Sequence, residues 1–118
     1  CIRDRAAFAP WTPGFSIPPG TDIAVNATSV GFHPNADATL DVDTSSFTSG
    51  MVVADVVANP PMTRWLRAAA DAGCTPLTGL GMLVNQALVN ARLWTGRTLN
   101  ADVMHHALEQ ALEIGEKS

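Results

Sequence analysis

The chain has 118 residues, of which 47% are hydrophobic and 15% are charged, and its net charge is −4. This balance is typical of a folded domain and excludes the weakly hydrophobic, highly charged class of disordered chains. The seven basic residues are scattered, which argues against nucleic acid and anionic membranes as partners. No apolar run approaches the roughly 20 residues of a membrane span. We therefore expect a cytoplasmic protein.

Residues 1–20 are predicted to be an irregular segment, because four prolines break both helices and central strands there. The opening Cys1–Arg5 resembles sequencing-adapter read-through, so native and non-native origins both stay open, and we assign it no function. Residues 21–118 carry the regular structure.

Two strands are expected in the first half of the chain. Residues 22–27 are predicted to be a short buried strand that ends in a polar turn. Residues 51–57 are apolar apart from Asp55, as expected for a parallel strand covered on both faces. The stretch 32–50 between them is predicted to be a long connection, with a helical turn near 43–47.

Three helices and a further strand are expected in the second half. Thr63 should cap the first helix and Gly73 should end it. Its apolar face is predicted to contain Leu66, Ala69 and Ala70. A short strand at 74–77 follows. Apolar residues recur at helical spacing in 80–94, which Gly96 ends, and again in 101–114. This order predicts an α/β fold with a mostly parallel sheet.

Ligands of such sheets bind outside the carboxyl ends of the strands. The sequence places three strand ends there, at residues 26–31, 55–59 and 78–81. Gly79 and Gly81 flank a strand-to-helix turn, where a missing side chain lets a flat ring approach the backbone. Met82 and Gln86 are one helical turn apart, so one bound molecule could touch both. The amide of Gln86 suits a polyhydroxylated substrate.

Four segments, taken in order, resemble the shikimate dehydrogenase family. They are Val25–Gly31, then Ala54–Val57 with Asn59-Pro60-Pro61, Thr63 and Leu66, then Gly79–Ala87, and finally Leu93–Gly96. The resemblance covers residues 20–114. It implies the C-terminal half of a Rossmann-like NADP-binding domain, followed by terminal helices that would pack on a substrate domain outside this chain.

The resemblance also implies a reaction and a site. The reaction is the reversible, NADP-dependent reduction of 3-dehydroshikimate to shikimate in aromatic amino-acid biosynthesis. The positions that match those beside bound NADP are Ala27, Thr28, Ser29, Val56, Gly79 and Met82. Gln86 matches a glutamine that hydrogen-bonds a substrate hydroxyl. The catalytic lysine and aspartate, the serine pair and the glycine-rich loop of the family lie upstream, so no catalytic residue is expected here, and this chain alone is expected to be inactive.

Two departures from the family pattern leave the substrate open. Ala58 occupies a position where the family often has a tyrosine whose hydroxyl touches the substrate, and Thr78 replaces an aspartate. A quinate or aminoshikimate dehydrogenase is compatible with both changes. A non-catalytic nucleotide-binding module is a further alternative.

Three other features have plain structural interpretations. Asp55 is interpreted as a structural hydrogen-bond acceptor at a strand end, because a buried carboxylate needs partners. No metal site is predicted, because the adjacent His105 and His106 point about 100° apart on a helix. Cys1 and Cys74 have neither zinc-ligand nor disulfide-framework spacing.

Overall fold

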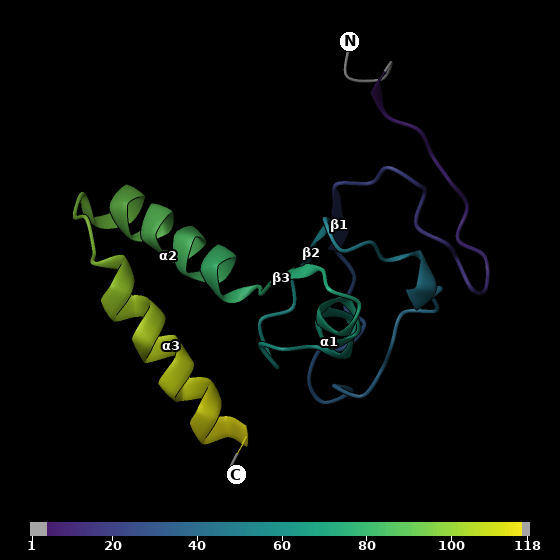
Figure 1. The fold of residues 1–118 in the computed structure, drawn as a ribbon. Coiled ribbons are helices and arrows are strands. Elements are labelled where there is room, and N and C mark those ends of the chain that lie inside the picture. The colour runs from purple at the N-terminus through teal and green to yellow at the C-terminus, as the bar shows by residue number, and fades with distance from the viewer. Residues whose placement is uncertain (1–4, 117–118) are drawn as a thin grey trace.

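The computed structural model describes residues 5–116 of the chain (Figure 1). Residues 1–4, within the stretch that resembles sequencing-adapter read-through, lie outside this range. The elements in chain order are β1 (Ile23–Asn26), η2 (Thr44–Ser46), β2 (Val52–Asp55), α1 (Arg64–Asp71), β3 (Thr75–Leu77), α2 (Leu80–Thr95) and α3 (Ala101–Glu116). Every predicted element is present, and the strands are shorter than the apolar runs that predicted them.

The three strands form a parallel sheet in the order β1-β2-β3. Asn26 pairs with Asp55 between β1 and β2, and Ala54 pairs with Leu77 between β2 and β3. Because all strands run in one direction, their carboxyl ends share one edge of the sheet. This confirms the α/β fold, which has the Rossmann-like arrangement implied by the resemblance.

Helix α1 covers one face of the sheet, and its ends match the local sequence signals (Figure 1). Thr63 Oγ1 accepts a hydrogen bond from the Leu66 amide at 3.3 Å and so caps the helix. Gly73, just beyond the helix, has a φ of +84°, a conformation that favours glycine. Leu66 and Ala69 are buried, as predicted, but Ala70 is exposed. The helical pattern placed Ala70 on the inner face, whereas the sheet covers only a narrower stripe around Leu66 and Ala69.

The core lies between α1, the sheet and the segments that precede β1 and β2. Its buried members are Ile17, Phe47, Met51, Val53, Leu66, Ala69 and Cys74. The opposite face of the sheet carries Ile23, Val25 and Leu77, whose exposed fractions are 62%, 55% and 58%. Apolar side chains of strands normally lie against a second layer, so this face is fitted for a covering that residues 5–116 do not supply.

The proline-rich segment is held in place more firmly than its composition predicts. The Gly14 amide donates to Asp41 Oδ1 at 3.0 Å, and the Ile17 amide donates to Ser46 Oγ at 3.0 Å. Backbone hydrogen bonds also join Phe15 to Asp41 and Asp43. The side chain of Ile17 is buried, with an exposed fraction of 8%. The prediction of an irregular segment holds for its secondary structure, but hydrogen bonds attach residues 14–17 to residues 41–46, and Ile17 is part of the core.

Helices α2 and α3 form a hairpin that extends away from the sheet (Figure 1). Gly96 ends α2 with a φ of +70°, as predicted. The radius of gyration of the chain is 16.5 Å, compared with about 13.5 Å for a compact domain of this length, and the hairpin contributes to this difference. Among the residues that the structure describes, no helix is long and apolar enough to cross a membrane.

Candidate functional site

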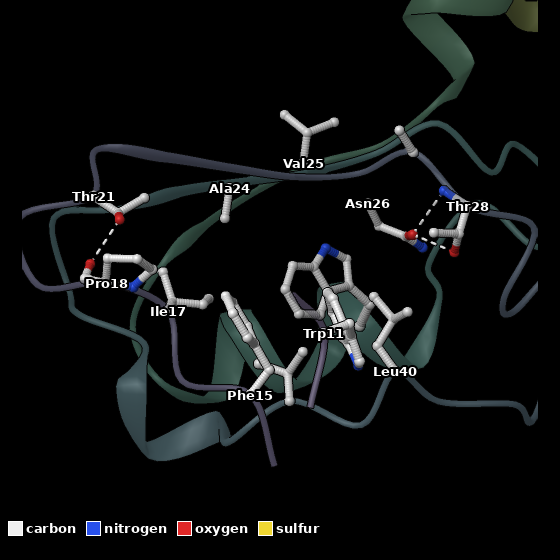
Figure 2. A pocket seen from close by; sticks show the side chains of 13 residues that line it. Trp11, Phe15, Ile17, Pro18, Thr21, Ala24, Val25, Asn26, Thr28 and Leu40 are labelled. Carbon is white, nitrogen blue, oxygen red and sulfur yellow. Dashed lines mark hydrogen bonds between the residues drawn. The ribbon is translucent and has the colours of Figure 1, made fainter. Parts of the chain in front are cut away.

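The turn after β1 is built around the buried side chain of Asn26 (Figure 2). Asn26 Oδ1 accepts hydrogen bonds from the Thr28 amide at 3.0 Å and from Thr28 Oγ1 at 2.7 Å. Thr28 Oγ1 in turn accepts from the Val30 amide at 3.2 Å. The hydrogen bonds of the Asn26 side chain hold this turn in place. Its three residues Ala27, Thr28 and Ser29 are exposed.

The turn after β2 is built around Asp55, which is 3% exposed. Its carboxylate accepts hydrogen bonds from the Val57 amide at 2.9 Å, from Thr63 Oγ1 at 2.7 Å and from Asn26 Nδ2 at 3.2 and 3.3 Å. This confirms the interpretation of Asp55 as a structural acceptor. The bond from Asn26 joins the first strand end to the second, since these residues are also Cα partners in the sheet.

The turn after β3 packs directly against the second turn. A Cβ added to Gly79 would lie 2.7 Å from the Val57 oxygen and 2.9 Å from the Val56 oxygen. These are backbone atoms and cannot swing aside, so only glycine fits. Gly81 differs, because nothing lies within 4 Å of an added Cβ there. The sequence predicts that a ligand ring lies close to the backbone at Gly79. In the structure, the backbone of Val56 and Val57 already lies against this glycine.

Helix α2 starts at this rim and carries a groove along one face. The groove has a volume of about 490 Å³ and is lined by Met82, Asn85, Gln86, Val89 and Asn90. Met82 and Gln86 thus share one hollow, as their spacing predicts. Asn85 Nδ2 donates to the Gly81 oxygen at 2.8 Å, which occupies its amide within the helix. The groove combines apolar and uncharged polar side chains, a composition suited to a hydroxylated ring or chain.

A second cavity, of about 200 Å³, adjoins β1 on the side of the proline-rich segment (Figure 2). Trp11 and Phe15 stack at one side with ring centroids 5.0 Å apart, and Leu40 and Trp65 also line the cavity. Asn26 and Thr28 lie at its polar end. The cavity is mainly apolar, so it offers a ligand hydrophobic surface and few hydrogen bonds.

Two of the three histidines, His105 and His106, lie on α3. His105 Nε2 is 3.3 Å from Glu109 Oε1 and His106 Nδ1 is 3.5 Å from Glu109 Oε2. Both histidines, with Asn85 and Asp102, line a hollow of about 300 Å³ between α2 and α3. Within residues 5–116, no group of three or more His, Cys, Asp or Glu side chains is arranged to hold a metal.

The structure brings the predicted site residues to one rim and one adjoining groove. Ala27, Thr28, Ser29, Val56 and Gly79 lie on the three strand-end turns, and Met82 and Gln86 follow on α2. Ala58 and Thr78, the two departures, are half-buried beside them. The contacts of these predicted site residues with ligands remain predictions.

Sequence reasoning missed the part of the site formed by Asn26 and Thr63. Both are at least 98% buried, and both bond to Asp55. A sequence pattern that could have indicated the bond between Asn26 and Asp55 is that each is a polar residue at the end of an apolar strand, and these two strands are neighbours in the sheet.

Comparisons with known proteins agree with this architecture. The family described as Shikimate 5'-dehydrogenase C-terminal domain matches residues 79–109, which cover Gly79, α2 and much of α3. A curated relative, the shikimate dehydrogenase (NADP(+)) of Methanopyrus kandleri, is 42% identical over 91 residues, which are 77% of this chain and 31% of that protein. The chain thus spans about a third of the length of curated relatives that it matches.

Solved structures extend the likeness to the fold. The ligand-free 5-ketofructose reductase of Gluconobacter sp. strain CHM43 superposes with a TM-score of 0.77 and 51% identity, over 86% of this chain and 36% of that one. A shikimate dehydrogenase in complex with NADP+ superposes with a TM-score of 0.76 and 36% identity, over 79% of this chain and 32% of that one.

Proposed function

This chain is a C-terminal region of the shikimate dehydrogenase family, and on that premise we propose that the complete protein is an NADP-dependent dehydrogenase. It interconverts a ketone and a secondary alcohol on a small polyhydroxylated substrate. One observation carries the proposal. The exposed turn at Thr28, the turn at Val56 and the Gly79 turn share one rim, and the groove with Met82 and Gln86 begins where that rim ends.

The residues of the rim fit the nicotinamide side of the cofactor. Ala27, Thr28 and Ser29 are exposed and rigidly backed, Gly79 adds no side chain, and Met82 offers an apolar surface. NADP, when bound, supplies the hydride acceptor and donor. The part of this chain is to hold the nicotinamide against the rim and the substrate against Gln86. The pyrophosphate loop and the catalytic pair are proposed to lie upstream, so the isolated chain is proposed to be inactive.

Shikimate and 3-dehydroshikimate are the first candidate substrate pair. The support comes from the relatives that carry the name shikimate dehydrogenase and from the glutamine at position 86. Aromatic amino-acid biosynthesis in the cytoplasm is the corresponding role. Quinate and aminoshikimate stay as alternatives within this class because of Ala58 and Thr78.

A second candidate is 5-ketofructose, favoured by the higher identity, 51%, to the Gluconobacter reductase. Ala58 is compatible with a substrate other than shikimate, because a methyl group cannot supply the hydroxyl contact of the tyrosine that the family often has there. The groove around Gln86 is uncharged, as suits a neutral sugar.

The proposal is tested on the complete protein with three substrates side by side. NADP reduction is followed with shikimate and with quinate, and NADPH oxidation with 5-ketofructose. Gln86→Ala should lower kcat/KM for the true substrate by about tenfold or more, the value of one substrate hydrogen bond. Gln110→Ala, at the other glutamine of the chain, is the matched control and should have no effect.

The outcomes separate the candidates. Turnover with shikimate that is sensitive to Gln86→Ala supports the first, and turnover with 5-ketofructose alone supports the second. Equal activity of the Gln86→Ala and Gln110→Ala variants would remove Gln86 from the substrate site. Absence of both turnover and NADP binding would contradict the proposed function.

A further inference from the structure

The buried carboxylate of Asp55 does more than tie two strands together. It accepts from donors on three segments, namely Asn26 Nδ2, the Val57 amide and Thr63 Oγ1, and none of them is a cation. A carboxylate without a cationic partner depends on these donors, because burial removes it from water. Each donor must therefore turn an N–H or O–H toward it.

This requirement, together with a hydrogen bond from Asn26 Nδ2 to the Val30 oxygen at 3.4 Å, sets the orientation of the Asn26 side-chain amide. An amide has a donor end and an acceptor end, and a carboxylate can only accept. The NH₂ end of Asn26 therefore faces Asp55, at 3.2 and 3.3 Å from its two oxygens. The carbonyl end is turned outward and accepts from the amide and the hydroxyl of Thr28 (Figure 2).

The orientation of Asn26 then sets what the Thr28 hydroxyl can offer. A hydroxyl has one proton and two lone pairs. Thr28 gives its proton to Asn26 Oδ1 at 2.7 Å and one lone pair to the Val30 amide at 3.2 Å. Thr28 is exposed, so what remains for a ligand is a lone pair. The hydroxyl can accept a hydrogen bond but has no proton left to donate.

We propose that Asp55 is a positioning residue that acts through Asn26 on Thr28, so that the Thr28 hydroxyl accepts a hydrogen bond from a ligand hydroxyl or amide N–H rather than donating one to an oxyanion. The inference rests on the proposed function for the identity of the ligand, NADP. Thr28 then contacts a ribose hydroxyl or the carboxamide N–H of the cofactor, and not a phosphate oxygen.

The isosteric substitution Asp55→Asn tests the chain of contacts. An asparagine at this position replaces one of the two oxygens that face Asn26 Nδ2 with an NH₂ group, which favours a flip of Asn26 that gives this group an acceptor. The flip turns the NH₂ end of Asn26 toward the Thr28 amide, which loses its acceptor. Hydrogen exchange at the Thr28 amide should therefore accelerate by tenfold or more in the complete protein without NADP. Thr63→Val lowers stability but leaves the carboxylate facing Asn26, so it should leave this exchange within about twofold.

A double-mutant cycle on NADP+ binding, measured by calorimetry, gives the second readout. Thr28→Val and Asp55→Asn should each weaken binding about five- to tenfold, as expected for one hydrogen bond. The double variant should bind no more weakly than either single variant, because Asp55 acts through Thr28. An effect of Asp55→Asn that is equal with and without Thr28 would indicate general loosening and would overturn the proposal.

Two further outcomes are distinguishable. If the wild-type protein fails to bind NADP+ while the exchange result is as expected, the proposed function fails and the positioning role of Asp55 stands. Unchanged exchange at Thr28 in Asp55→Asn overturns the positioning role whatever binds. Should Asp55→Asn not fold, Asn26→Ala replaces it, since it removes the acceptor of Thr28 and must give the same exchange and binding pattern.

Discussion

Single residues of this chain are constrained by contacts that their residue types do not reveal. Gly79 is required because the carbonyl oxygens of Val56 and Val57 occupy the space of a side chain. Asp43 is exposed, yet the hydroxyls of Ser16 and Ser45 both donate hydrogen bonds to its carboxylate. Each case gives a prediction for a point substitution.

Gly79→Ala should destabilise the complete protein by about 1–3 kcal/mol, because the new methyl group overlaps backbone atoms and forces them apart. Gly81→Ala is the matched control. An added Cβ at Gly81 meets nothing within 4 Å, and alanine favours the helix by up to about 1 kcal/mol. Urea unfolding of both variants checks the pair, and equal stabilities would contradict the packing argument.

Hydrogen bonds from the Ser45 hydroxyl and amide, with a smaller contribution from Ser16, hold the pKa of Asp43 below its ordinary value of 3.8. A lowered folded pKa means that the stabilisation is present above 3.8 and is lost as the pH falls through the folded pKa. An NMR titration should therefore find the Asp43 midpoint below 3.8. Ser45→Ala should move the midpoint upward more than Ser16→Ala does, and the reverse order would refute this assignment of causes.

At the scale of elements, α1 is joined to the sheet through its own cap. Thr63 Oγ1 accepts from the Leu66 amide and donates to Asp55 Oδ2 at 2.7 Å, and Thr63 is 1% exposed. The helix start and the second strand end therefore form one buried hydrogen-bonded unit. Loss of this hydroxyl affects both elements at once.

Thr63→Val keeps the shape of the side chain but removes the hydroxyl, and it should lower the free energy of unfolding by about 1–3 kcal/mol. Thr63→Ser keeps the hydroxyl and loses only a methyl group, which should cost about 1 kcal/mol or less. Thermal unfolding of the two variants in the complete protein compares them. A serine variant as unstable as the valine variant would show that packing of the methyl group, and not the hydroxyl, is what matters.

At the scale of the whole molecule, two apolar surfaces are open in residues 5–116. One is the sheet face with Ile23, Val25 and Leu77, and the other is the helical hairpin with Leu93 and Trp94, which are 75% and 80% exposed. Apolar areas of this kind mark surfaces that another part of a protein covers. The chain spans about a third of its curated relatives, and on the proposal that it belongs to a longer protein, the rest of that protein is the expected cover.

The 118-residue chain prepared alone should therefore bind the dye ANS with a strong rise in fluorescence, while the complete protein should not. Urea-unfolded chain serves as the control, because a fully unfolded chain offers the dye no ordered apolar surface. Equal dye binding by the chain and the complete protein would mean that the sheet face and the hairpin stay open in both.

The sequence alone determined the order of strands and helices, the parallel sheet and the ends of the helices. These features depend on local chemistry: apolar runs for strands, helical spacing for α2 and α3, the capping hydroxyl of Thr63, and glycines with positive φ at Gly73 and Gly96. The resemblance further selected Thr28, Gly79 and Gln86, which the structure brings to one rim and groove, although their ligands remain proposals.

Only the tertiary structure decided how the rim is built. The bond between Asn26 and Asp55 joins residues 29 positions apart, and the proline-rich segment docks on residues 41–46. The exposure of Ala70, against the helical pattern, depends on how far the sheet extends over α1. Such features arise from contacts between distant segments, and a local pattern carries no information about which segment lies opposite. For the same physical reason the sequence marked Asp55 as a buried acceptor but could not identify its donors.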